Sequence, residues 1–408
     1  MERYSEYKDS GVKWLGEIPR HWEVRKAKYL WRESFATSEN GSEELLSVSQ
    51  YEGVTPSKGE SRSESLKGYK IVSENDLVIN IMLAWLGGLG VSKCNGIVSP
   101  AYCIYKMIGD SSPRFLYYLY KTPLYLAEFA RHSTGVVPSR WRMYTDDFGQ
   151  VLTLLPPQKE QEAIANYLDA ATSKIDEAIG QQQKMIELLN ERKQIIINNA
   201  VTKGLDPNVP MKDSGIEWIG EIPEHWEVIP YRYLFYNLDY QRRPVTADQR
   251  SRNNPQYDYY GASGVIDKID YYNVDDKVLL IGEDGANLLL RNLPLIYKAE
   301  GKFWVNNHAH ILKPIKNDYD YMAYVMEAAD YTLYITGSAQ PKLSQANLNC
   351  VKLPIPPMEE QKAIVAYLWK RTNKIDTAIN KTNKMISLLQ ERKQIIINEV
   401  VTGKVKVT

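Results

Sequence analysis

The sequence predicts a mixed α/β protein: a pseudo-twofold tandem repeat in which two strand-rich domains are separated by two long antiparallel coiled-coil helices. Three observations predict this fold. Two blocks of sequence recur about 200 residues apart, one of them carries a sustained 3.5-residue apolar period, and short strand-like runs fill the segments between them. The expected boundaries are 1–155 for the first domain, 156–203 for the first long helix, 204–355 for the second domain and 356–408 for the second long helix.

Composition excludes several classes of protein. A chain of 408 residues is too long for one compact core. The 50 basic and 50 acidic residues cancel, which excludes a polybasic nucleic-acid binder but not a local basic face. The three cysteines form no CxxC pair, so a reducing cytoplasm is expected. Met1 to Ser10 are polar, unlike a signal peptide, and the glycine-containing apolar stretch 77–91 reads as a strand and turn rather than a membrane span.

Sequence similarity between the two repeats is confined to two blocks with clear boundaries. Residues 8–24 and 212–228 match at 13 of 17 positions, and residues 156–202 and 356–402 match at 29 of 47. The segments between these blocks, 25–155 and 229–355, barely resemble each other. Plain drift after a duplication would erode all segments alike, so the repeated blocks share one role while the variable blocks differ. The earlier block, with its His-Trp pair, is interpreted as a structural clip that docks the start of each repeat rather than as a catalytic site.

The later block is expected to be a long helix that begins after a Pro-Pro pair. Its apolar positions follow a period of alternating four and three residues, which indicates a coiled-coil seam. The predicted seam positions are Ile164, Leu168, Ala171, Ile175, Ala178, Met185, Leu189 and Ile196, with Ile364, Leu368, Ile375, Ala378, Met385, Leu389 and Ile396 in the second copy. An ordinary amphipathic helix packed on its own domain is the alternative. About 40 residues at about 1.5 Å each favour a rod, and Gly204 to Pro207 should end the first one.

The variable blocks read as strand-rich α/β segments. Runs at 77–83, 277–284 and 303–315 are bounded by Gly, Asn and Pro and predict strands. Residues 113–130 and 320–335 have helical spacing and occupy corresponding places, so the two blocks are expected to share a fold.

No catalytic constellation is expected. The chain has no phosphate-binding loop and no Asp/Asn-Pro-Pro-aromatic tetrad of an amino methyltransferase. His308 and His310 could offer two metal ligands on one strand face, but hydrogen-bonded structural histidines fit better. The acidic string 282–286 reads as a turn rather than a calcium loop. No metal site and no catalytic residue is therefore predicted.

Polar and basic loop residues of the variable blocks are the candidate DNA contacts. Arg can bind guanine bidentately, Asn or Gln can bind adenine, and Lys mainly meets phosphate. The candidates are Lys58, Arg62, Ser139, Arg140 and Arg142 in the first block, and Arg242, Arg243, Arg250, Arg252, Asn253, Gln340 and Lys342 in the second. A solvated loop surface without a ligand is the alternative for each of them.

These features together resemble the specificity subunit of type I restriction–modification systems. The resemblance rests on SGVKWLGEIPRHW and SGIEWIGEIPEHW, on PPQKEQEAI and PPMEEQKAI, and on the two rods. The second half adds YYGASGVID, LIGEDGA, WVNNHAHIL and GSAQPKLS, and the first half has GIVSPAY and STGVVPSRW in comparable places.

The resemblance implies a subunit without an active site, in which each of two target-recognition domains reads one half of a split asymmetric DNA site. The helices would set the unread spacer. Two methyltransferase subunits that use S-adenosylmethionine and two motor-nuclease subunits that use ATP and Mg would bind it, so no cofactor is expected in this chain. Two other hypotheses remain: a coiled-coil protein-interaction scaffold without DNA specificity, and a methyltransferase fused to its own reader, against which the missing tetrads argue.

Overall fold

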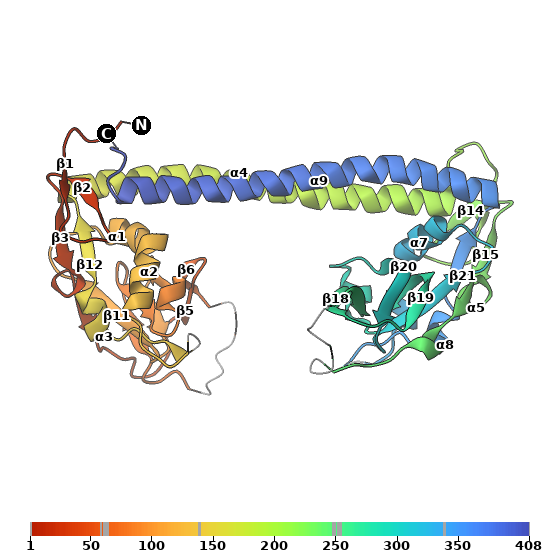
Figure 1. The fold of residues 1–408 in the computed structure, drawn as a ribbon, viewed down its shortest axis with the longest axis horizontal. Helices are drawn as coiled ribbons and strands as arrows, with labels where there is room; N and C mark the ends of the chain where they lie inside the picture. Colours follow the sequence, from red (N-terminus) through yellow and green to blue (C-terminus); the bar gives the residue numbers. More distant parts are fainter. Residues whose placement is uncertain are drawn as a thin grey trace. The chain divides into compact units, whose positions relative to one another are not determined.

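The computed structural model describes residues 2–57, 59, 65–137, 140–246, 250, 255–337 and 340–407. It divides into two compact units, one made of Met1–Gln183 with Asn383–Thr408 and the other of Lys184–Thr382 (Figure 1). Each unit combines a strand-rich domain with one half of each long helix. The predicted α/β fold with two long helices is confirmed. In the described part of the chain, no helix is long and apolar enough to cross a membrane.

The domain of the first unit is built on a four-stranded antiparallel sheet of order β4-β11-β8-β9, flanked by two-stranded pairs. Its strands are β1 Tyr7–Asp9, β2 Glu17–Pro19, β3 Glu23–Lys26, β4 Trp31–Ser34, β5 Leu46–Ser49, β6 Gly53–Pro56, β7 Lys70–Val72, β8 Leu77–Asn80, β9 Leu89–Val91, β10 Gly96–Val98, β11 Tyr102–Met107 and β12 Leu152–Leu155. Its helices are η1 Ala27–Tyr29, η2 Ala84–Leu86, α1 Pro113–Tyr120, α2 Pro123–Arg131 and α3 Thr145–Gln150. The helix expected over 113–130 is split because Pro123 begins a new helix, with Thr122 as its N-cap.

The domain of the second unit is built on a six-stranded sheet of order β16-β21-β19-β20-β17-β18. Its strands are β13 Met211–Asp213, β14 Glu221–Pro223, β15 Glu227–Pro230, β16 Phe235–Asn237, β17 Tyr257–Gly261, β18 Gly264–Ile269, β19 Val274–Gly282, β20 Ile296–Val305, β21 Ala309–Pro314 and β22 Lys352–Ile355. Its helices are α5 Tyr231–Leu234, η4 Asp239–Gln241, α6 Ala286–Leu290, α7 Tyr319–Ala328, η6 Thr332–Tyr334 and α8 Gln345–Leu348. The helix expected over 320–335 ends at Ala328, and only the short η6 follows it.

Each variable block is closed at its base by one pair of antiparallel strands. In the first unit β3 enters the block and pairs with β12, which leaves it, with Glu23 opposite Leu155. In the second unit β15 pairs with β22 in the same register, with Glu227 opposite Ile355. The same antiparallel strand pair therefore joins the two ends of both variable blocks, although the blocks differ in sequence. The sequence analysis did not predict this strand pair.

One buried glutamine in each repeated helix contacts the backbone of its variable domain. Gln161 is buried; its amide donates to Pro156 O at 2.8 Å and accepts from the backbone N of Ser112, at the start of α1, also at 2.8 Å. Gln361 does the same with Pro356 O and with the backbone N of Asp318, at the start of α7, both at 2.9 Å. The bonds from Ser112 N and Asp318 N use backbone groups of the variable blocks and do not depend on side-chain type there, although Gln361 Nε2 also donates to Asn317 Oδ1 at 2.9 Å.

The long helices are α4 Gln158–Lys203 and α9 Met358–Val401, and Gly204 follows α4 with a φ of +73°, as expected for a helix end. In the first unit Ile164 and Leu168 of α4 share a core with Ile397 and Val400 of α9. In the second unit the roles are exchanged: Ile364 and Leu368 share a core with Ile197 and Ala200.

Two ion pairs continue this pairing, one in each unit. Lys393 Nζ lies 2.6 Å from Asp176 Oδ2, and Lys193 Nζ lies 2.6 Å from Asp376 Oδ1. As residue numbers rise along one helix they fall along the other, so the pairing within each unit is antiparallel, as predicted.

The predicted seam is wrong at Met185 and Met385, which are each 49% exposed. The half-buried positions run instead through Ala178, Gln182, Ile186 and Leu189, and through Ala378, Thr382, Ile386 and Leu389. These steps of four, four and three make an eleven-residue repeat. A straight helix with 3.6 residues per turn drifts from a strict 3.5-residue period, and this repeat corrects the drift.

The clip predicted for the earlier repeated block is confirmed. Glu160, in the first turn of α4, accepts a hydrogen bond from Trp22 Nε1 at 3.1 Å and lies 2.7 Å from His21 Nε2. Glu360, in the first turn of α9, makes the same contacts with Trp226 at 2.9 Å and His225 at 2.7 Å. Both tryptophans are fully buried. His21 and His225 therefore fix the start of each repeat to a helix N-terminus, where a carboxylate is favoured.

Candidate nucleic-acid interface

The candidate surface of the first unit forms where the turn 81–86, after β8, meets the loop 133–143. Met143 N donates to Ile81 O at 3.0 Å, and Thr134 and Arg142 exchange two backbone hydrogen bonds of 2.9 Å. The Trp85 and Trp141 rings pack edge to face with centroids 5.3 Å apart. The turn and the loop are thus fastened to each other at both backbone and side-chain level.

Two predicted contact residues lie on this surface. Arg140 is exposed. The guanidinium of Arg142 donates to Arg140 O at 3.2 Å and contacts Met82 Sδ at 3.7 Å. Two exposed apolar side chains lie on the same loop, Val136 at 95% and Val137 at 44% exposure. The surface therefore combines cations with apolar groups.

The second unit repeats this arrangement with different side chains. Thr336 and Lys342 exchange backbone hydrogen bonds of 2.9 and 2.8 Å, and Leu343 N donates to Glu283 O at 2.8 Å. Glu283 follows β19, as Ile81 follows β8. A Cβ on Gly337 would lie 2.6 Å from Gln340 O, and a Cβ on Gly135 would lie 2.6 Å from Arg140 O. Both loops therefore need a glycine at the equivalent place.

Acidic and basic groups alternate on the second surface. Arg242 Nη1 lies 2.7 Å from Glu283 Oε2, and Lys342 Nζ lies 3.5 Å from Glu283 Oε1. Burial opposes ionisation of Glu283, but the hydrogen bond from Arg242 and the charges of His310, Arg242 and Lys342 hold its pKa below the usual value. The site thus joins Arg242 and Lys342 through one ionised carboxylate, and Arg242 is only 19% exposed.

The remaining described candidates of the second unit differ in their exposure and in their contacts with other residues. Arg243 is exposed and donates to Tyr240 O and Arg242 O, both at 2.8 Å. Gln340 is exposed in its loop. Arg250 pairs with Asp267 at 2.8 Å and stacks over the Tyr259 ring at 4.7 Å, which leaves it 21% exposed. Five further candidates, Lys58, Arg62, Ser139, Arg252 and Asn253, lie outside the described residues.

The histidine pair of the second domain has a structural explanation. His310 is buried, with Nδ1 2.6 Å from Asp239 Oδ2 and Nε2 2.8 Å from Leu343 O. Burial would raise the pKa of Asp239, but the hydrogen bond and charge of His310 hold it below the usual value. His310, on β21, therefore ties the backbone at Leu343 to the sheet. His308 instead lies beside Asp284, at 2.9 Å. Among the described residues, no cluster of three His, Cys, Asp or Glu side chains could hold a metal ion.

Sequence reasoning did not include the turns that follow β8 and β19 among the candidate contacts. The segment containing Met82 was read as part of a buried strand, and the one containing Glu283 as a plain turn. The available signal was positional: each turn follows a buried strand, and each is backed by a loop of the pattern Thr-Gly followed by a cation.

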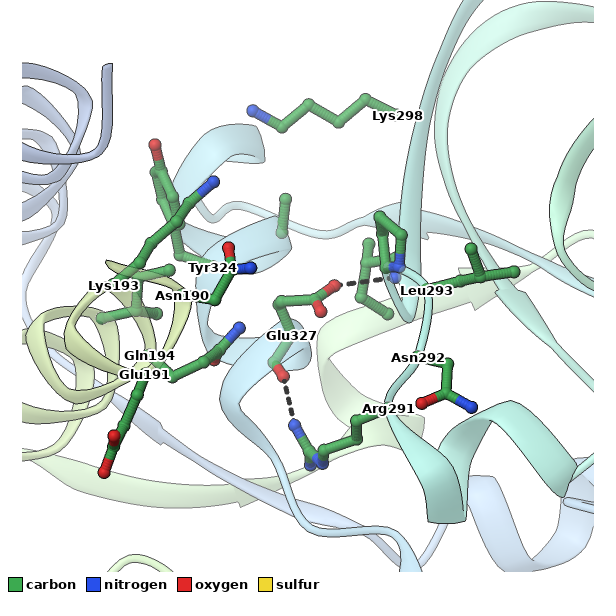
Figure 2. A pocket seen from close by; sticks show the side chains of 14 residues that line it. Asn190, Glu191, Lys193, Gln194, Arg291, Asn292, Leu293, Lys298, Tyr324 and Glu327 are labelled. Atoms are coloured by element: carbon green, nitrogen blue, oxygen red, sulfur yellow. Dashed lines mark hydrogen bonds between the residues drawn. The ribbon is translucent and has the colours of Figure 1, made fainter. Parts of the chain in front are cut away.

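A separate cavity of about 510 Å³ in the second unit lies between α4 and the domain (Figure 2). Glu327 reaches into it and accepts hydrogen bonds from the backbone N of Leu295 and Ile296, at 3.0 and 2.9 Å. Burial raises the pKa of Glu327, although these amides and the charges of Arg291 and Lys193 oppose the rise. Arg291 donates to Glu327 O and Ala329 O at 3.1 and 2.6 Å. These hydrogen bonds join α7 and the residue that follows it to the segment 291–296 of the same domain.

Comparison with known proteins agrees with this geometry. The family model described as the type I restriction modification DNA specificity domain matches residues 223–387. A putative type I restriction enzyme MjaX specificity subunit of Methanocaldococcus jannaschii is 24% identical over 96% of both chains. The MjaVIII specificity subunit of the same organism is 27% identical over 64% of this chain and 63% of its own.

A solved chain from a study of complex assembly and conformational transition of the type I R-M system has the same fold. It superposes with a TM-score of 0.67 at 13% identity and covers 95% of this chain and 99% of its own. Residues 223–387 thus match the type I restriction modification DNA specificity domain, and over nearly its whole length the chain is similar to a putative specificity subunit of a type I restriction enzyme.

Proposed function

We propose that this chain is the subunit that reads a split DNA site, each domain recognising one half through the turn and loop described above. One observation carries the proposal: two equivalent turn-and-loop surfaces stand on repeated supports but present different side chains. The first offers Arg140 and Arg142 among apolar groups, and the second offers Lys342 and Gln340 beside acids. Such residues can contact base edges and phosphates.

The modular attachment of the domains supports independent reading. Each variable block is joined through a strand pair and through a glutamine that accepts a hydrogen bond from its backbone. We expect that exchanging residues 25–155 for the block of another specificity subunit changes only one half of the methylated site. Methylome sequencing of cells carrying the complete system tests this. Changes in both halves would contradict independent reading.

We further propose that the long helices dock two methyltransferase subunits. Each helix carries an apolar stripe turned away from the helix seam, and the stripe occurs once in each unit. Its members are Met185, Leu188 and Ile195 at 49%, 52% and 52% exposure, and Met385, Leu388 and Ile395 at 49%, 51% and 48%. Equal surfaces presented twice suit two copies of one partner, and exposed apolar patches mark interaction sites.

Docking can be tested one stripe at a time. We expect Leu188→Ser to yield a complex with one methyltransferase subunit, Leu388→Ser the same, and the double variant none. Native mass spectrometry of co-purified complexes gives the stoichiometry. The control is Leu333→Ser, an 86% exposed leucine away from the helices. Full occupancy in the double variant would contradict the proposed docking face.

In this proposal the chemistry belongs to the partners. The methyltransferase subunits supply S-adenosylmethionine-dependent adenine methylation, and two motor-nuclease subunits use ATP and Mg. This chain contributes binding and positioning alone.

A further inference from the structure

The reading surface of the first unit is apolar where that of the second is acidic. The positions that follow β8 are Ile81 and Met82, and the equivalent positions after β19 are Glu283 and Asp284. The segments 80–88 and 132–143 contain no acidic residue. The two domains therefore present different chemistry at the same place in their folds.

Apolar side chains on this surface are held outward by the structure. Met82, Leu83 and Leu86 are 38%, 40% and 41% exposed, while the neighbouring Ala84 is fully buried and anchors the turn. Trp85 donates from Nε1 to Met82 O at 3.2 Å and packs on Trp141, which fixes the turn against the loop. The exposed apolar side chains therefore lie on a turn whose conformation is fixed by its contacts with the loop, as expected for a binding surface.

The charge around the apolar patch suits DNA. Arg140 and Arg142 lie on the same loop as Val136 and Val137, so a duplex could place phosphates against the cations and base edges against the apolar groups. In the major groove the only apolar base feature is the 5-methyl group of thymine. An apolar protein partner would gain nothing from the two arginines.

We infer that the patch formed by Met82, Val136 and Val137 is a specificity-determining element that recognises thymine methyl groups in the half-site read by the first unit. This inference rests on the proposed function and adds the base chemistry that one domain selects. It predicts at least one thymine in that half-site, besides the one paired with the methylated adenine, whose methyl group contributes to binding. The acidic surface of the second unit should show no such dependence.

The test replaces each thymine of the recognised duplex in turn by deoxyuridine, which lacks only the methyl group. Binding of the full chain in complex with its methyltransferase partner is measured at fixed salt. We expect about a fourfold loss of affinity at one or more positions of the first unit's half-site, the effect of burying one methyl group less. Replacements in the other half-site should change affinity far less.

A variant links the effect to the patch. Met82→Gln combined with Val136→Ser should bind thymine and deoxyuridine duplexes equally well. Because both side chains are exposed, the fold should tolerate the change. Leu333→Ser, in the second unit, is the control and should keep the full thymine preference. Loss of the preference in the control, or its persistence in the double variant, would overturn the assignment.

The possible outcomes distinguish failure of this inference from failure of the proposed function. Two results would overturn the proposed recognition of thymine but not the proposed function. One is sequence-specific binding that no deoxyuridine replacement in that half-site weakens, and the other is a half-site that contains no additional thymine. Absence of any sequence-specific binding by the complex overturns the proposed function instead.

Discussion

At the scale of single residues, the glycines that end the long helices couple each helix to a clip. Gly403 has a φ of +73°, and a Cβ there would lie 2.5 Å from Pro19 Cδ. Gly109 has a similar φ of +75° with nothing within 4 Å. We expect Gly403→Ala to lower the free energy of unfolding by about 2–3 kcal/mol, since it incurs both backbone strain and a clash, and Gly109→Ala by about 1 kcal/mol. Urea unfolding of both variants measures this, and equal losses would contradict the packing.

Glu327 gives a second prediction at this scale, on pH. Since burial raises its pKa in the folded state, the folded chain binds that proton more tightly than the unfolded chain. Its contribution to stability therefore falls as pH rises from the unfolded pKa of about 4.3 through the raised folded value. We expect Glu327→Gln, which can still accept the two backbone hydrogen bonds, to gain stability relative to wild type across that rise. Denaturation at several pH values measures it, with the exposed Glu300→Gln as control. A gain that is independent of pH would contradict the assignment.

At the scale of elements, the antiparallel helix pairing was predictable because its signal is long and repeated. The exposed turn after β8 was not predictable, because its residues are as apolar as those of the buried strand before it. The hydrogen bonds that Met143 and Trp85 donate to Ile81 O and Met82 O show where the strand ends. The exposure of Met185 was missed because we assumed a strict 3.5-residue period. An α-helix has 3.6 residues per turn, so positions counted in heptads gradually rotate out of the seam. The sequence alone does not separate candidate DNA contacts from internal ion pairs, because the same residue types form both, as Arg242 shows.

The register of the helix pair can be tested through its ion pairs. Lys193 and Asp376 are 28% and 45% exposed, so their attraction is partly screened. We expect Lys193→Asp to destabilise the chain by about 1 kcal/mol and added Asp376→Lys to recover most of it. Lys374→Asp, an exposed position on α9, is the matched control for charge change alone. Thermal unfolding at low and high salt measures the effect, which should shrink with salt. A reversed pair no more stable than the Lys193→Asp variant would contradict this register.

At the scale of the whole molecule, constant and variable parts follow a division of labour. Equivalent strand pairs and glutamine bonds hold both domains at their base although the side chains of the two domains differ, while the clip repeats the His and Trp contacts to Glu160 and Glu360. The repeat arithmetic anticipated this division, because the repeated blocks contain the clip and the helices. What it could not supply is the chemistry of each reading surface, which arises where turn and loop meet.

The spacer between the two half-sites should depend on helix length. The chain passes from one unit to the other near Gln182 and Thr382, where both helices are continuous. We expect seven-residue insertions after both positions to preserve the apolar period and to lengthen each helix by about 10 Å, and so to lengthen the unread spacer by about three base pairs of 3.4 Å. A seven-residue insertion in one helix alone is the control and should abolish methylation, because it breaks the pairing register. Methylome sequencing reads the spacer directly; an unchanged spacer in the doubly extended chain would mean that the helices do not set it.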